Sequence, residues 1–125
     1  MEYIKEKKHI LVIDDMQPVL KFLQVVLRRE GFETILAEGG KAGFEAYQEH
    51  QDKIKMIILD LQMPEVSGFD IAREIRKTDT KIPILAQTAL AREEDRQNAF
   101  EAGCSDFLIK PIDIEQLKEI INKYR

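Results

Sequence analysis

Five side chains that could take part in chemistry lie where apolar, strand-like runs end. They are three carboxylates, one hydroxyl and one amine: Asp14, Asp15, Asp60, Thr88 and Lys110. The run before Asp60 covers residues 56–59, and Pro64 prevents a strand from continuing far beyond it. A single strand-end aspartate is often only a turn residue or a helix cap. Four strand ends that carry complementary groups instead predict one shared site.

The types of these side chains indicate a particular chemistry. Carboxylates that are crowded together in a partly desolvated site repel one another, and a hard divalent cation such as Mg²⁺ relieves that repulsion. The amine of Lys110 can pair with an aspartate or with an added anion, and the hydroxyl of Thr88 can donate to a phosphoryl oxygen. The set therefore predicts phosphoryl transfer to an aspartate, with metal and lysine neutralising the phosphoryl oxygens.

These residues need a scaffold that brings distant strand ends to one edge. Strand-like and helix-like segments alternate five times along the chain. The expected strands cover 9–14, 32–37, 56–59, 82–87 and 106–109, and the expected helices cover 18–30, 41–50, 67–77, 92–102 and 113–124. This alternation predicts an α/β fold with a parallel sheet, right-handed crossovers and helices on both faces. At 125 residues the chain is too short for an eight-stranded barrel, so we expect an open, doubly wound (βα)5 three-layer sandwich.

Apolar spacing also predicts the buried faces of two helices. The expected stripe of the first helix is Val19, Phe22, Leu23, Val26 and Leu27, and that of the last helix is Ile114, Leu117, Ile120, Ile121 and Tyr124.

Composition and length limit the class of protein. With 19 basic and 23 acidic residues the formal net charge is −4, which argues against direct nucleic-acid binding. The single cysteine, Cys104, excludes an internal disulfide and fits a reducing compartment. No apolar run approaches the roughly 20 residues of a membrane span, and no signal peptide is expected. We therefore expect a cytoplasmic domain over 9–125, after a short solvated lead-in over 1–8, with no membrane contact through this domain.

The order of these motifs closely resembles the receiver (response regulator, CheY-like) domains of two-component signalling. The fragments that carry the resemblance are Ile13-Asp14-Asp15, Leu59-Asp60-Leu61-Gln62-Met63-Pro64 with Gly68, Thr88-Ala89, and Phe107-Leu108-Ile109-Lys110-Pro111. The resemblance spans nearly the whole chain. It implies a flavodoxin-like fold whose five-stranded parallel sheet has the order 2-1-3-4-5.

The resemblance also implies roles for the acidic residues and for Gln62. Asp60 would be the phosphoacceptor. Asp15, Asp60 and the backbone carbonyl of Gln62 would bind Mg²⁺ (or Mn²⁺), and Asp14 would hold a metal-bound water. An acid often follows the aspartate pair in the family, whereas this chain has Met16. One negative charge near the metal site is therefore absent, which affects the metal affinity but not the presence of the site.

Further roles follow from the same resemblance. Lys110 would contact the phosphoryl group, and the Lys110–Pro111 peptide would be cis. Thr88 would be the switch hydroxyl and Phe107 the switch aromatic. Gln62 and Leu90 would flank the path of the hydrolytic water, and we expect apolar Leu90 to impede that water and prolong the phosphoaspartate.

The implied function is that of a phosphoacceptor in a two-component phosphorelay. The phosphoryl donor would be a phosphohistidine on a histidine kinase or on a histidine phosphotransfer domain. Phosphorylation would switch the surface formed by segments 92–102, 106–109 and 113–124, which could also form a dimer. The domain would catalyse its own phosphorylation and dephosphorylation without turning over an external substrate.

Alternatives remain open at this point. A phosphorylation-independent interaction module of the same fold would usually lack an acid, the lysine or the hydroxyl, and this chain has them all. Hydrolases of the dehalogenase type have a second aspartate where Gln62 stands, and Asp14 and Asp15 would repel the phosphate of a flavin. The segment 82–91 resembles receivers attached to hybrid histidine kinases, and a free-standing regulator is the alternative context.

Overall fold

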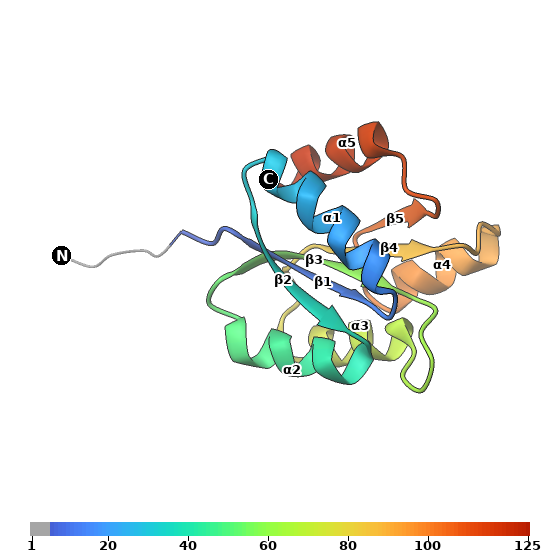
Figure 1. The fold of residues 1–125 in the computed structure, drawn as a ribbon. Coiled ribbons are helices and arrows are strands. Elements are labelled where there is room, and N and C mark those ends of the chain that lie inside the picture. Colours follow the sequence, from blue (N-terminus) through green and yellow to red (C-terminus); the bar gives the residue numbers. More distant parts are fainter. Residues whose placement is uncertain (1–5) are drawn as a thin grey trace.

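A computed structural model describes residues 6–125 and shows five strands alternating with five helices (Figure 1). The elements are β1 (His9–Asp14), α1 (Gln17–Arg29), β2 (Glu33–Glu38), α2 (Gly40–His50), β3 (Ile54–Asp60), α3 (Gly68–Thr78), β4 (Ile84–Thr88), α4 (Glu93–Glu101), β5 (Asp106–Ile109) and α5 (Ile114–Tyr124). Every expected element is present, with ends that differ by a few residues. Of the expected lead-in, residues 6–8 are exposed and have no regular structure, and the rest lies outside the described residues.

The strands form one parallel sheet in the order β2-β1-β3-β4-β5, which confirms the predicted topology. In a parallel sheet all carboxyl ends lie on the same edge, and the arrowheads in Figure 1 point to that edge. β1 and β3 are neighbours at the centre, and β4 lies beside β3. The fold therefore brings the ends of β1, β3, β4 and β5 together, although they are far apart in the sequence.

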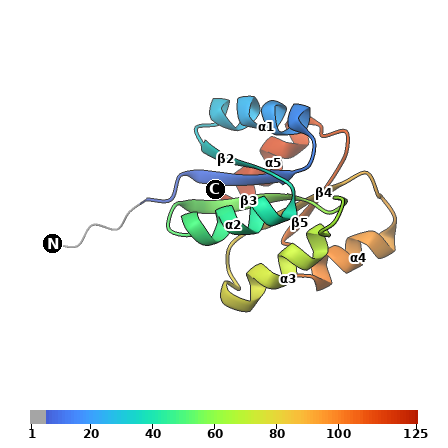
Figure 2. The ribbon, with the colours of Figure 1, turned by 60° about the horizontal axis from the view of Figure 1, so that its bottom comes forward.

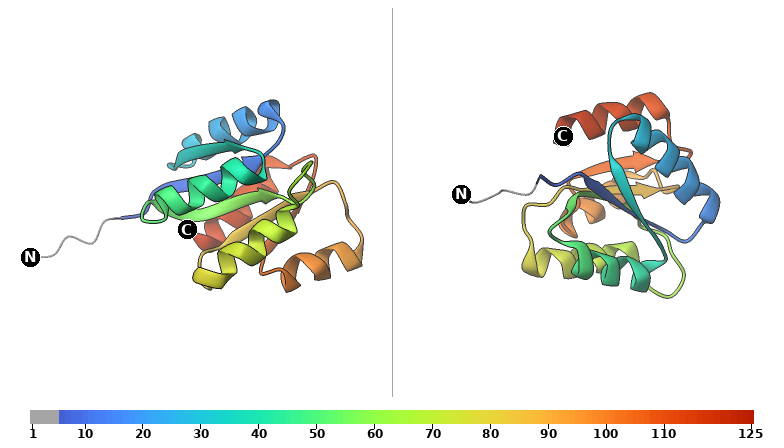
Figure 3. Two further views of the ribbon diagram at one scale, coloured as in Figure 1. Left: turned by 90° about the horizontal axis from the view of Figure 1, so that it is seen from below. Right: turned by 60° about the vertical axis from the view of Figure 1, so that its left-hand side comes forward.

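Helices cover both faces of the sheet. Figure 2 and Figure 3 show α1 and α5 on one face and α2, α3 and α4 on the other. Alternate strand residues point to the two layers: Ile10 and Val12 of β1 pack with α1 and α5, whereas Leu11 and Ile13 pack with the other helices. This is the doubly wound arrangement predicted from the sequence.

Two positions in the predicted helix stripes are wrong. α1 buries Leu20, Leu23, Val26 and Leu27, whereas Phe22 lies to the side of this stripe and is 40% exposed. α5 buries Leu117, Ile120 and Ile121, but Ile114 is 40% exposed. Because helical side chains tilt towards the N-terminus, a side chain in the first turn extends past the end of the helix and is less covered.

The start of α3 is pressed against the end of β3. Ser67 caps α3, since its Oγ accepts a hydrogen bond from Phe69 N at 3.1 Å. At Gly68, a Cβ atom would overlap the carbonyl oxygen of Asp60 and lie 2.7 Å from Leu61 Cα. Both obstructing atoms belong to the backbone, so they cannot yield without moving Asp60 itself. Glycine at this position therefore fixes where the strand end of Asp60 lies.

We predict that Gly68→Ala lowers the free energy of unfolding by about 2–4 kcal/mol, since the added methyl group displaces the backbone of β3. Chemical denaturation of the parent and the variant measures this. The matched control is Gly31→Ala, because Gly31 has a positive φ of +94°, but the atom nearest to the point that a Cβ atom there would occupy is in the side chain of Arg125, 4.0 Å away. The control should cost about 1–2 kcal/mol of backbone strain and displace no strand. Equal losses for the two variants would contradict the role assigned to Gly68.

Candidate functional site

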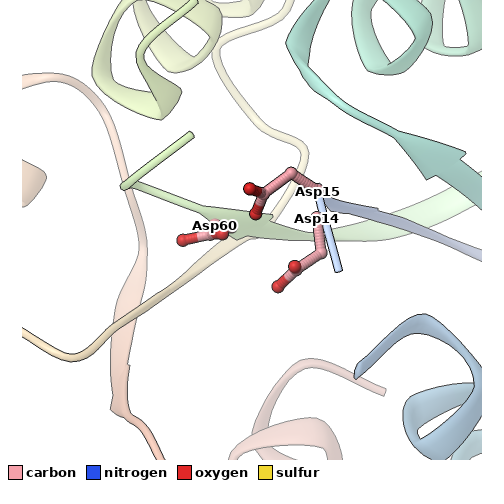
Figure 4. A group of neighbouring side chains, drawn as sticks. All are labelled: Asp14, Asp15 and Asp60. Atoms are coloured by element: carbon pink, nitrogen blue, oxygen red, sulfur yellow. The ribbon is translucent and has the colours of Figure 1, made fainter. Parts of the chain in front are cut away.

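Three carboxylates gather at the carboxyl ends of the neighbouring strands β1 and β3 (Figure 4). One oxygen from each of Asp14, Asp15 and Asp60 lies within 4.8 Å of the other two. Asp14 is fully buried and Asp60 is 1% exposed, whereas Asp15 is half-buried. The structure therefore brings together the three acids singled out in the sequence.

The ammonium group of Lys110 lies against this cluster. Its Nζ is 3.0 Å from Asp14 Oδ2 and 3.4 Å from Asp60 Oδ2. Lys110 follows β5 directly, its backbone N donates to Thr88 O at 2.8 Å, and the Lys110–Pro111 peptide is cis. Burial lowers the pKa of Lys110, but the two carboxylates outweigh burial and leave it above its ordinary value. The lysine is therefore a fixed positive charge between two acids.

Asp14 is held in place by three further groups besides the acids. Its Oδ1 accepts a hydrogen bond from Met16 N at 2.8 Å, and its Oδ2 accepts from Lys110 Nζ and from Gln87 Nε2 at 2.9 Å. Gln87 is fully buried, and its Oε1 has no hydrogen-bond partner among the described residues. The sequence reasoning assigned no role to Gln87. The available signal was a polar residue in an apolar strand, two positions after Leu85 and hence on the same face.

The phosphoacceptor candidate, Asp60, has an unusual pKa. Its Oδ1 accepts a hydrogen bond from Gln62 N at 2.9 Å. Burial is the main cause that raises its pKa from 3.8 to about 6, and repulsion from Asp14 adds to it, while Gln62 N–H and Lys110 oppose the rise. The carboxylate therefore takes up a proton close to neutral pH. A group that carries its negative charge at a cost accepts a cation readily.

The candidate switch residues are Thr88 of β4 and Phe107 of β5, and both lie on the face of the sheet opposite to Gln87. Thr88 is 1% exposed; its Oγ1 donates to Gln62 Oε1 at 3.1 Å and accepts a hydrogen bond from Leu90 N at 3.1 Å. Phe107 is buried in the core on the α4 side, with the guanidinium of Arg96 5.7 Å from its ring centroid. Thr88 thus forms hydrogen bonds to the loop after β3 and to the loop after β4. Phe107 of β5 contacts Arg96 of α4.

The donor set fits a hard divalent cation. The clustered ligand atoms are all carboxylate oxygens, which suit Mg²⁺. Three carboxylates and one ammonium leave a formal charge of −2 when all are ionised, which a divalent cation would neutralise. The residues present therefore agree with the metal site expected from the sequence.

Among the described residues, no helix has the length and apolar character that crossing a membrane requires.

Comparisons with known proteins agree with this geometry. The sequence profile of the family described as "Response regulator receiver domain" matches residues 10–122. The chain is 29% identical over 119 residues to the polar-differentiation response regulator DivK of Brucella anthropi, which covers 94% of this chain and 95% of that protein. It is also 36% identical over 121 residues to hybrid signal transduction histidine kinase L of Dictyostelium discoideum, covering 92% of this chain and 7% of the kinase.

The fold has solved counterparts as well. The response regulator TrrA of Thermotoga maritima, solved in complex with Mg(2+)-BeF, superposes with a TM-score of 0.85 at 29% identity, covering 94% of this chain and 99% of TrrA. The chain spans less than half the length of several curated relatives that it matches.

The raised pKa of Asp60 predicts a pH-dependent gain in stability for Asp60→Asn. Because the folded protein binds this proton more tightly than the unfolded chain, the parent loses stability as the pH rises from about 4 to about 7. The variant lacks this loss. We expect its free energy of unfolding, relative to the parent, to rise by about 2–3 kcal/mol over that range. Denaturant unfolding at several pH values in metal-free buffer measures the difference, and a pH-independent difference would contradict the prediction.

Proposed function

This chain belongs to the family of response regulator receiver domains of two-component systems, and we propose that it accepts a phosphoryl group on Asp60 in a Mg²⁺-dependent reaction. Receiver domains bind Mg²⁺ at an acidic cluster and interact with histidine kinases or phosphotransfer proteins. The single observation that carries the proposal is the buried pair of Asp14 and Asp60 sharing the ammonium of Lys110.

The transfer step uses the carboxylate of Asp60 as nucleophile. A carboxylate oxygen attacks the phosphorus of a phosphohistidine, an O–P bond forms, and the N–P bond breaks with its electron pair left on the imidazole. Lys110 Nζ, 3.4 Å from Asp60 Oδ2, lies within reach of an incoming phosphoryl oxygen. Its donation to that oxygen stabilises the charge that the transfer brings into the site.

The metal ligands proposed here are Asp15, Asp60 and the backbone carbonyl of Gln62. When bound, Mg²⁺ (or Mn²⁺) neutralises the negative charge that gathers on the phosphoryl oxygens. Asp14 suits the role of orienting a water ligand rather than binding the metal directly. Its two oxygens already accept hydrogen bonds from Met16 N, Gln87 Nε2 and Lys110 Nζ.

The proposed output is a change in the surface formed by α4, β5 and α5. Thr88 would turn its hydroxyl to the phosphoryl group. Phe107 is already buried, at 4% exposure, so its side chain would repack inside the core as Thr88 moves rather than turn inward from solvent. Arg96 over the Phe107 ring gives α4 a direct contact with this aromatic residue. Phe100 of α4 and Ile109 of β5 are 45% and 39% exposed, so this surface offers apolar area to a partner or to a second copy of the chain.

The proposed phosphoryl donor is a phosphohistidine on a histidine kinase or a histidine phosphotransfer domain. The matched relatives include both a response regulator of similar length and a hybrid kinase of which this chain covers a small part. Both a free-standing regulator and a module of a hybrid kinase agree with these matches. We propose that this phosphoryl transfer takes place in the cytoplasm. The free, buried Cys104 agrees with a reducing compartment.

The proposal is tested by intact-protein mass spectrometry after incubation with acetyl phosphate and Mg²⁺. We expect one phosphoryl adduct on the parent, and none when Mg²⁺ is withheld or when Asp60→Asn replaces the nucleophile. A beryllofluoride titration covers the case in which hydrolysis outpaces detection. If the parent forms no adduct and binds no beryllofluoride, the fold serves a phosphorylation-independent interaction module instead.

The lifetime of the phosphoaspartate provides another test. The resemblance to the family implies that Leu90 flanks the path of the hydrolytic water, where a polar side chain could orient that water and an apolar side chain cannot. We predict that Leu90→Asn hydrolyses its phosphoaspartate about fivefold faster than the parent, as expected for one added hydrogen bond of about 1 kcal/mol. Loss of the phosphoryl adduct over time measures both rates. Equal hydrolysis rates for the parent and the variant would contradict this role for Leu90.

A further inference from the structure

The hydroxyl proton of Thr88 already has an acceptor. A threonine hydroxyl has one proton to donate and two lone pairs that can accept. Leu90 N donates to Thr88 Oγ1 at 3.1 Å, and the proton of Oγ1 goes to Gln62 Oε1, also at 3.1 Å. Thr88 therefore cannot donate to a phosphoryl group on Asp60 until it releases Gln62.

Gln62 contacts both the phosphoacceptor and the switch hydroxyl. Its backbone N donates to Asp60 Oδ1 at 2.9 Å, while its side-chain carbonyl accepts from Thr88, which lies 26 positions further along the chain. The backbone contact anchors Gln62 to the group that receives the phosphoryl. The side-chain contact gives Thr88 a partner in the absence of that phosphoryl.

The backbone of Thr88 is held independently of Gln62. Thr88 pairs with Ile109 in the sheet, and its carbonyl accepts from Lys110 N at 2.8 Å. The preceding carbonyl, of Gln87, accepts from Leu61 N at 3.0 Å. The hydroxyl can consequently be redirected by rotation of the Thr88 side chain, without separation of the strands, once its bonds to Gln62 Oε1 and Leu90 N are broken.

We propose that Gln62 is a positioning residue that holds the Thr88 hydroxyl in its unphosphorylated orientation and competes with the phosphoryl group for it. The inference rests on the proposed function, since it assumes that an anion arrives at Asp60. A phosphoryl oxygen carries charge, and charge-assisted hydrogen bonds are stronger than neutral ones, so the phosphoryl group wins the competition. The Gln62–Thr88 hydrogen bond therefore determines how much of the free energy of phosphoryl binding is used to reorient the Thr88 hydroxyl.

Removal of the competing acceptor should make a phosphoryl mimic bind more tightly. Gln62→Met keeps the length of the side chain and the backbone carbonyl but lacks the amide oxygen. Because Gln62 is exposed, we expect the variant to fold. A neutral hydrogen bond of ordinary strength corresponds to a gain in affinity of about 2- to 10-fold.

The test is a double-mutant cycle on the affinity for beryllofluoride in saturating Mg²⁺, measured with the parent, Gln62→Met, Thr88→Val and the double variant. Equilibrium binding avoids the hydrolysis step, on which Gln62 has a separate expected effect. We expect Gln62→Met to tighten binding about 2- to 10-fold when Thr88 is present and to leave it unchanged within about twofold alongside Thr88→Val. Gln48→Met, the same change on an exposed position of α2, is the matched control and should have no effect.

Two results would overturn the inference while leaving the proposed function intact. One is equal beryllofluoride affinity in the parent and Gln62→Met, and the other is the same gain with and without the Thr88 hydroxyl. If the parent binds no beryllofluoride, the proposed function fails, and a measurement without ligand then tests the positioning role of Gln62.

That measurement is of the three-bond couplings of Thr88 by NMR. They should show one side-chain rotamer in the parent and averaging between rotamers in Gln62→Met. A single, unchanged rotamer in both proteins would contradict the positioning role.

Discussion

Two almost completely buried carboxylates, Asp14 and Asp60, share a single ammonium group, that of Lys110, at the carboxyl edge of the sheet. Burying charge is costly unless it is paired and hydrogen-bonded, and two acids with one base leave the pair incompletely neutralised. Burial is the main cause that raises the pKa of Asp60 to about 6, and repulsion from Asp14 adds to it. The site is therefore prepared for added positive charge.

Strand pairing, a close backbone contact and apolar packing maintain this arrangement. Parallel pairing of β1 with β3 sets the two acids on adjacent strands, and the register of β4 with β5 brings Lys110 beside Thr88. Gly68 allows the start of α3 to contact the backbone of Asp60 at a distance that no side chain would permit. The apolar layers on both faces then exclude water from Asp14 and Asp60, and this exclusion gives the ion pairs their strength.

Two glutamines extend the site beyond the charged residues. Gln87 donates to Asp14 from inside the sheet, and Gln62 spans the short distance between Asp60 and Thr88. Both use neutral amide groups, so they orient charged or switching partners without adding to the charge of the cluster. The network is not fully satisfied, because Gln87 Oε1 is buried and has no hydrogen-bond partner among the described residues, and an unpaired buried polar atom is costly.

The βα alternation, the parallel sheet and the residues at the strand ends could be predicted without coordinates, because apolar periodicity and strand-end polarity are local properties of the chain. The sequence also named Asp14, Asp15, Asp60, Thr88 and Lys110 as one cluster, since parallel strands share a carboxyl edge. The hydrogen bonds from Gln87 to Asp14, 73 positions away, and from Thr88 to Gln62 become visible only in the folded protein. The same is true of the exposure of Phe22 and Ile114. Such contacts depend on side-chain rotamers and on how helices lie on the sheet, and these are settled by packing among residues that are distant in the sequence.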